Sequence, residues 1–161
     1  MSKLGIISDT HGLLNETLLA VRLFREQGVQ TVIHCGDIGG SGIISVFQEI
    51  ETHFVLGNMD FDGETLQTAA DDTGNHLHGW FGSIERVGKR IAFLHGHHSE
   101  KMDQEVESGN WDLICYGHTH VPALQMSGTT MLLNPGAFKK VYRPTVAIVT
   151  LPDLTVERFS I

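Results

Sequence analysis

The order of apolar and polar positions in the first sixty residues alternates between two patterns. Short apolar runs, typical of buried strands, are separated by segments with the spacing of an amphipathic helix. Asn15 is in a position to cap the first of these helices, and Gly28 follows its end. The pattern predicts strands at 3–8, 30–35 and 53–58 and helices at 16–27 and 43–50, hence parallel strands with right-handed crossovers.

The rest of the chain is richer in strands joined by turns. Gly88-Lys89, Ser127-Gly128 and Pro152-Asp153 each separate two strand-like segments, as the turn of a β-hairpin does. A helix is expected over 99–108 and a strand over 111–117, and the pairing in this half is expected to be mostly antiparallel. With no repeat or linker, the pattern predicts one domain over residues 1–161. Its fold class is α/β, with two packed sheets covered by helices.

Composition and charge exclude several classes of protein. The 161 residues are 41% hydrophobic, which is typical of a globular chain rather than a disordered one. A formal net charge of −8 argues against non-specific binding to nucleic acid or to an anionic membrane. The apolar runs are too short to span a bilayer, and the start lacks the features of a signal peptide. A cytoplasmic protein is therefore expected, with Cys35 and Cys115 as buried free thiols.

Side chains that can bind a metal ion follow five of the predicted strands. Taken singly, a residue of these types after a strand more often belongs to an ordinary turn or makes an ordinary hydrogen bond. Five strand ends that all carry such residues would require five independent coincidences. The carboxyl ends of strands in α/β sheets line the ligand crevice, so these side chains converge if the strands share a direction. In chain order they are Asp9 and His11, then Asp37, then Asn58, then His95, then His118 and His120.

The types of donor indicate a particular chemistry. Carboxylate, imidazole and amide oxygen suit Mn²⁺, Fe²⁺, Zn²⁺ or Mg²⁺, whereas clustered cysteines, the mark of many structural zinc sites, are missing. Two such ions, about 3.5–4 Å apart, are the usual arrangement for hydrolysing phosphate esters.

The spacing of these residues resembles that of a known family. Asp9-x-His11, Gly36-Asp37, Gly57-Asn58, His95 and Gly117-His118-x-His120 match, in order, the five motifs of the calcineurin-like metallophosphoesterases. The words "SDTHG", "VIHCGD", "HGHH", "YGHTH" and "NPGA" are similar to those of the small phosphodiesterases of the YfcE type. The resemblance covers almost the whole chain.

The resemblance implies a four-layer α/β/β/α sandwich of two mixed sheets, the metallo-dependent phosphatase fold. It also implies two divalent ions per chain, Mn²⁺ in the first place, with Mg²⁺, Ni²⁺, Fe²⁺ or Zn²⁺ as alternatives. Asp37 would bridge the ions, and a water activated between them would attack phosphorus. Asn58 would also donate its NH₂ group to a phosphate oxygen. One ion would be held by Asp9, His11, Asp37 and His120, the other by Asp37, Asn58, His95 and His118.

One position departs from the broader superfamily. Many members have a histidine directly after the Gly-Asn pair, where this chain has Met59, so the general acid is unassigned. His97 is the candidate for that role, and a supporting or rim position is the alternative. Smaller expectations concern other polar residues. His34 is expected in the core, and His53, His76 and His78 are expected on the surface or in loops. Asp60 and Asp62 could support the metal ligands, but acidic loop residues are usually solvated. Asn134-Pro135-Gly136 is expected in a tight turn, which the resemblance places near the metal cleft, where its backbone could contact the substrate. Lys139, Lys140 and Arg143 are expected on a solvated face that could attract phosphate.

Three functions remain open beside a phosphodiesterase acting on a small phosphorylated substrate. One is a phosphomonoesterase. Another is a scaffold without catalysis, as in a retromer subunit of the same fold, although every expected ligand position is filled here. A nuclease is disfavoured by the acidic charge and by the lack of a basic, aromatic groove. Relatives commonly form dimers or larger assemblies, which leaves the oligomeric state of this chain open.

Overall fold

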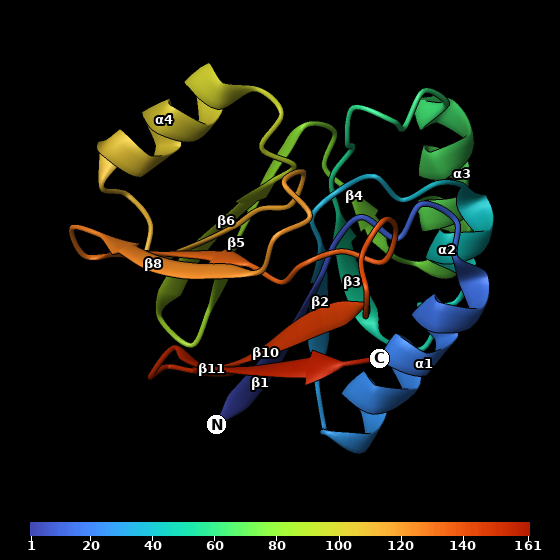
Figure 1. Cartoon of the computed structure of the whole chain (residues 1–161), viewed down its shortest axis with the longest axis horizontal. Coiled ribbons are helices and arrows are strands. Elements are labelled where there is room, and N and C mark those ends of the chain that lie inside the picture. Colours follow the sequence, from blue (N-terminus) through green and yellow to red (C-terminus); the bar gives the residue numbers. More distant parts are fainter.

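Two β-sheets pack face to face in the computed structural model, which describes all of residues 1–161, and helices cover both outer faces (Figure 1). The first sheet has the order β11-β10-β1-β2-β3-β4 and the second the order β5-β6-β7-β9-β8. The predicted four-layer α/β/β/α sandwich is confirmed. The strands of the first sheet are β1 (Ser2–Ile7), β2 (Thr31–His34), β3 (Glu51–Phe54), β4 (His76–Leu77), β10 (Thr145–Leu151) and β11 (Thr155–Ser160). Those of the second are β5 (Phe81–Arg86), β6 (Lys89–Leu94), β7 (Leu113–Cys115), β8 (Ala123–Ser127) and β9 (Thr130–Asn134).

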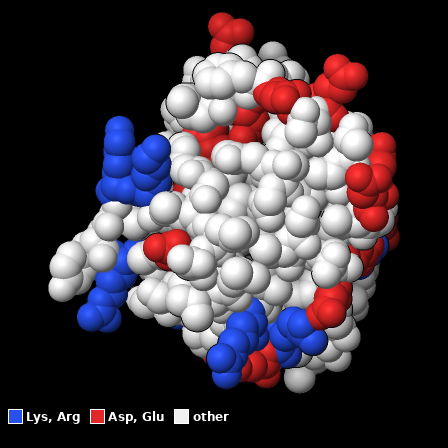
Figure 2. All heavy atoms as spheres, turned by 90° about the vertical axis from the view of Figure 1, so that its right-hand side faces the viewer, with Lys and Arg blue, Asp and Glu red and all other residues white.

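Four helices form the outer layers. Helices α1 (Leu14–Glu26), α2 (Ser41–Ser45) and α3 (Gly63–Thr73) lie on the first sheet, and α4 (Ser99–Ser108) lies on the second (Figure 1). None of them has the length and apolar character that crossing a membrane requires. The face made by α1 to α3 carries Lys and Arg in some places and Asp and Glu in others, mostly at its rim (Figure 2).

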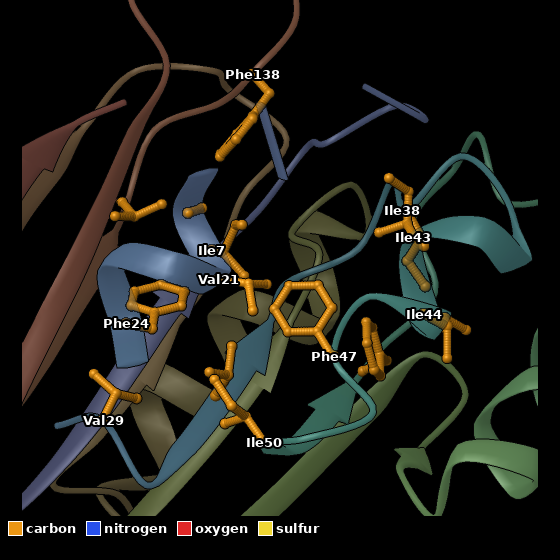
Figure 3. Close-up of a cluster of buried hydrophobic side chains, with 14 of the residues drawn as sticks. Ile7, Val21, Phe24, Val29, Ile38, Ile43, Ile44, Phe47, Ile50 and Phe138 are labelled. Atoms are coloured by element: carbon orange, nitrogen blue, oxygen red, sulfur yellow. The ribbon is translucent and has the colours of Figure 1, made fainter. Parts of the chain in front are cut away.

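Alternation along the strands divides the core into layers. Ile7 faces the helices and packs with Phe24 of α1 and with Phe47 (Figure 3). Its neighbour Ile6 points the other way, into the layer between the sheets, where it belongs to the same cluster as Phe93. This is the two-residue period of a strand with both faces buried. Cys35 and Cys115 lie in the same inter-sheet layer as free thiols, as predicted.

The strand directions differ from the expectation for the second half of the chain. Strands β6 and β7 pair in parallel, and so do β7 and β9. The expectation of mostly antiparallel pairing is therefore wrong for the centre of this sheet. The reason is topological, because α4 carries the chain from β6 to β7, and β8 takes the outer position beside β9. The carboxyl ends of parallel strands lie at the same edge of the sheet, so the loops that follow these strands can meet there.

Two elements between β3 and β5 have no counterpart in the sequence pattern. Helix α3 begins where the Asp62 carboxylate accepts a hydrogen bond from the Thr65 N–H, and it ends at Gly74 in the left-handed conformation. It buries only Leu66 and Ala70, so its apolar periodicity is weak. Strand β4, two residues long, follows it.

The helix cap that was expected at Asn15 is wrong, because α1 begins at Leu14 and Asn15 lies inside the helix.

Candidate metal centre

The seven predicted ligand residues meet at one edge of the sandwich, after the carboxyl ends of β1, β2, β3, β6 and β7. Oδ1 of Asp9 lies 3.1 Å from Nε2 of His120. Oδ2 of Asp37 lies between two imidazoles, 3.5 Å from Nε2 of His11 and 3.4 Å from Nε2 of His95. The parallel strands and their loops thus bring together residues that are more than a hundred positions apart in the chain.

The donors form two overlapping groups. In one group Asp9 faces His11 and His120, and in the other Asp9 and Asp37 face His95, with the donor atoms of each group within 4.8 Å of one another. Oδ1 of Asn58 completes the second group. It is 3.0 Å from Nε2 of His95 and 3.1 Å from Nδ1 of His118.

Asp9 has a feature that fits a bound cation. Its Oδ2 accepts hydrogen bonds from the Ser8 hydroxyl at 2.5 Å and from the His118 N–H at 3.1 Å. Its Oδ1 is buried without any hydrogen-bond partner. A buried carboxylate oxygen without a partner is costly, and a cation among the surrounding imidazole nitrogens would remove that cost. The donor set therefore fits divalent ions.

Surrounding groups hold the donors in orientations that suit a metal. Nδ1 of His95 is 2.8 Å from the carbonyl of Cys35, which can only accept, so Nδ1 donates there and Nε2 faces the site. Oδ1 of Asp37 accepts from the Met59 N–H at 2.9 Å, which leaves Oδ2 for the site. Burial opposes ionisation of Asp37, but His95 and the Met59 N–H outweigh it, so the pKa of this carboxyl lies below its usual value.

The backbone at the site is strained. Non-glycine residues rarely adopt a positive φ, and such residues persist at functional sites because the surroundings enforce them. Five of the seven predicted ligands have φ between 45° and 68°, namely Asp9, His11, Asp37, His118 and His120. Sharp turns directly after the strands therefore direct these side chains back to a common centre.

Two glycines allow the loops to approach each other closely. A Cβ on Gly57 would collide with the backbone nitrogen and the carboxylate of Asp37. A Cβ on Gly117 would collide with the Ser8 hydroxyl and the Asp9 carboxylate. The glycines of the Gly-Asn and Gly-His motifs are thus required by packing against the carboxylates.

Comparison with known families agrees with this geometry. A family model described as the calcineurin-like phosphoesterase superfamily domain matches residues 2–153. The chain belongs to this superfamily.

Named relatives support the narrower resemblance. The chain is 31% identical over 137 residues to phosphodiesterase MJ0936 of Methanocaldococcus jannaschii, with 83% of this chain and 82% of that protein covered. It is 26% identical over 153 residues to phosphodiesterase YfcE of Escherichia coli strain K12, covering 85% and 79%. A solved structure described as a novel archaeal phosphodiesterase superposes with a TM-score of 0.93 at 28% identity and covers 99% of both chains. The resemblance to the YfcE-type phosphodiesterases is confirmed.

The candidate metal centre opens to solvent on one side. Asp9 and His95 lie at its buried floor, and Asn58 and His118 lie exposed at its rim. A cavity of about 170 Å³ adjoins it, lined in part by His95, His97 and Trp80. A substrate could therefore reach the donors from the rim.

His97 lies beside the predicted ligands. Its ring centroid is 5.4 Å from that of His95 and 6.2 Å from that of His118. Burial, together with the nearby imidazoles of His98, His95 and His118, lowers the pKa of His97 to about 4. The ring is then neutral near pH 7. As a proton donor it would need the negative charge of a bound phosphate to raise its pKa.

Three supporting residues were missed or misjudged from the sequence. For Asp60 a solvated position was favoured over a supporting one. It is buried and accepts from the N–H groups of Ile38, Gly39 and Gly57, so it ties the second and third loops together. Ser8 holds Asp9, as described above. Asn134 donates to the Gly117 carbonyl and to the Thr119 hydroxyl and so fixes the turn that carries His118 and His120. The resemblance placed the Asn134-Pro135-Gly136 turn near the metal cleft, but nothing in the sequence indicated these two contacts.

His34 lies behind the site, in the core as predicted. It is fully buried, with Nε2 2.9 Å from the Thr10 hydroxyl and Nδ1 accepting from the Gly36 N–H. Burial, with His95 nearby, lowers the pKa of His34 to about 3, so this ring stays neutral. It braces the loops that carry His11 and Asp37.

Proposed function

We propose that residues 1–161 form one domain that hydrolyses small phosphodiesters with two divalent ions per chain, Mn²⁺ in the first place. The proposal rests on the family, on relatives that are named phosphodiesterases, and on one observation above all. That observation is the buried, unpartnered Oδ1 of Asp9 among four imidazole and carboxylate groups from different strands.

The distances support a definite assignment of ligands. Asp9, His11, Asp37 and His120 would hold one ion, and Asp37, Asn58, His95 and His118 the other. Oδ2 of Asp37 is nearly equidistant from His11 and His95, one histidine from each set, which supports Asp37 as the bridge. His118 would bind through Nδ1, the nitrogen that faces Oδ1 of Asn58.

Divalent ions in such a site lower the pKa of a coordinated water and stabilise charge on the phosphoryl oxygens. The chain's own residues would position the substrate. Oδ1 of Asn58 faces the two histidines, so its NH₂ group is available to donate to a phosphate oxygen. Lys139 lies near enough to His11 to affect its titration, and it would attract the phosphate.

The leaving group would receive little help from the protein. Met59 has no titratable group, and His97 is neutral until a phosphate binds beside it. We therefore expect diesters with stable leaving groups to react faster than those with poor ones. His97 stays a candidate for the proton donor.

An assay on metal-stripped protein tests the proposal. Mn²⁺, Ni²⁺, Mg²⁺ or Zn²⁺ is added back, and release of p-nitrophenol is followed from bis-p-nitrophenyl phosphate and from the monoester. Metal-dependent cleavage that is faster on the diester is the expected result. Faster cleavage of the monoester would favour a phosphomonoesterase. Two bound ions without cleavage of either substrate would favour a binding scaffold.

A further inference from the structure

A second group of histidines lies outside the centre described above. His53 and Glu51 are two positions apart on β3, so their side chains share one face of the sheet. The parallel register places His76 of β4 beside His53, and His78 follows two residues later. All four thus gather on one side of a two-strand ribbon at the edge of the first sheet. His53 was expected on the surface or in a loop, but it is a buried strand residue.

The donor atoms in this group are as close as those of a metal site. The donor atoms of Glu51, His53 and His76 all lie within 4.8 Å of one another. Nε2 of His53 is 3.4 Å from Oε1 of Glu51, and the rings of His53 and His76 stack with centroids 4.7 Å apart. The chain therefore places one carboxylate and two imidazoles close together.

One ring nitrogen of His53 lacks a hydrogen-bond partner. The residue is 6% exposed, and its Nε2 is buried without a hydrogen-bond partner. The approach to Glu51 does not have the geometry of a hydrogen bond. Its other nitrogen, Nδ1, is 2.9 Å from Nε2 of His78. If Nδ1–H donates to His78, the lone pair of Nε2 points at the carboxylate, an arrangement that is favourable only with a cation between them.

Neighbouring side chains hold the carboxylate of Glu51 in place. Partial burial opposes ionisation of Glu51, but hydrogen bonds from Thr31 and Arg86 lower the pKa of this carboxyl overall. Arg86 donates to Oε1 at 2.6 Å and holds the carboxylate from β5 of the other sheet.

We propose that Glu51, His53 and His76 form a second, separate metal site, with His78 positioning His53. Two imidazoles and one carboxylate suit a divalent ion of the later first-row series, Zn²⁺ above all, and three protein ligands leave a position open. The ion would fasten the two-residue edge strand β4 to β3 and, through the pair of Glu51 and Arg86, to the other sheet. The ion would thus help to hold this edge of the sheet together.

Imidazole NMR on the full, metal-stripped chain tests the proposal without a variant. Zn²⁺ is titrated, and long-range ¹H–¹⁵N spectra follow the ring nitrogens of each histidine. We expect Nε2 of His53 and one ring nitrogen of His76 to shift on binding, in addition to the ligands of the other centre. If neither His53 nor His76 responds to Zn²⁺, the site does not exist.

Zinc content after equilibrium dialysis gives a second readout. His76→Ala removes an exposed side chain, and Glu51→Gln removes the carboxylate charge; each is expected to hold one Zn²⁺ per chain fewer than the wild type. Glu49→Gln, at an exposed glutamate paired with Arg25, is the matched control and is expected to keep the full content. Equal content in all four proteins, or the same loss in the control, would overturn the proposal.

Discussion

The two histidine-rich regions of this chain are built in different ways. In the candidate metal centre the donors lie in loops after strands, and five of them have the left-handed backbone. In the Glu51–His53–His76 group the donors lie within β3 and β4, and none of them has a positive φ. The comparison suggests that strain accompanies a site whose donors must come from several strands and face an open rim. Donors that are already neighbours in a sheet need no such strain.

The largest expected effect on activity comes from a change at Asp37, the proposed bridge between the two ions of the candidate metal centre. Asp37→Asn keeps the shape but removes the charge that both ions would share. We expect kcat/KM on a diester to fall by more than about 100-fold, the upper end for loss of an outer-shell partner of a metal. Metal content should fall as well.

The control for this change is Asp62→Asn, at the exposed cap of α3. It should retain full activity, because the amide oxygen can still accept from the Thr65 N–H. Full turnover and full metal content in Asp37→Asn would show that Asp37 is no bridge.

The close approach of the loops is tested by Gly57→Ala. The added Cβ collides with Asp37, so we expect a loss of stability of about 1–3 kcal/mol and a weakened metal centre. Urea denaturation and metal content measure the two effects. Gly42→Ala, in α2, meets no atom within 4 Å and should be neutral or slightly stabilising. An equal effect at both glycines would contradict the account.

The buried histidines make the metal-free chain sensitive to acid. The folded-state pKa of His34, about 3, lies below its unfolded value of 6.5. As the pH falls below 6.5, the unfolded state takes up a proton that the folded state refuses, so stability present at pH 7 is lost toward pH 3. Between pH 6.5 and 5 we expect a loss of roughly 1–2 kcal/mol from His34.

Denaturation curves at several pH values, measured in the presence of a chelator, follow this loss. His34→Gln should flatten the slope, because glutamine does not titrate. His53→Gln should flatten it in the range from pH 6.5 to about 4. If neither variant changes the slope, the two rings do not stay neutral in the folded chain.

The smallest effect on catalysis is expected at the rim of the candidate metal centre. Lys139→Ala should raise KM for a phosphodiester about two- to fivefold with little change in kcat, as suits an exposed charge worth less than about 1 kcal/mol. Lys140→Ala is the neighbouring control and should leave KM unchanged. Steady-state kinetics at low and high salt would distinguish the two variants, because the effect of Lys139→Ala on KM should become smaller at high salt. Equal changes in KM for the two variants would show that the overall positive charge of the loop, and not Lys139 in particular, attracts the phosphate.

The sequence allows the first region to be predicted because its signals are local. Each strand is followed at once by a carboxylate, an imidazole or an amide beside a glycine, so Asp9, Asp37 and His95 are visible without knowledge of the fold. The layer order and the buried cysteines also follow from local patterns and from the family resemblance.

The features that were missed depend on distant contacts. His53 meets His76 only because β4 pairs with β3, and β4 is too short to have a pattern of its own. Asp60 is fixed by N–H groups of a loop some twenty positions earlier in the chain. The parallel pairing of β6 with β7 depends on the path of α4, which no alternation of residues reports.

Crystals of the metal-stripped chain soaked in Mn²⁺ would test the central claim most directly through anomalous scattering. The account predicts two manganese peaks about 3.5–4 Å apart at the carboxyl ends of the strands, with Asp37 in contact with both. A single peak, or two peaks with Asp37 bound to neither, would contradict it.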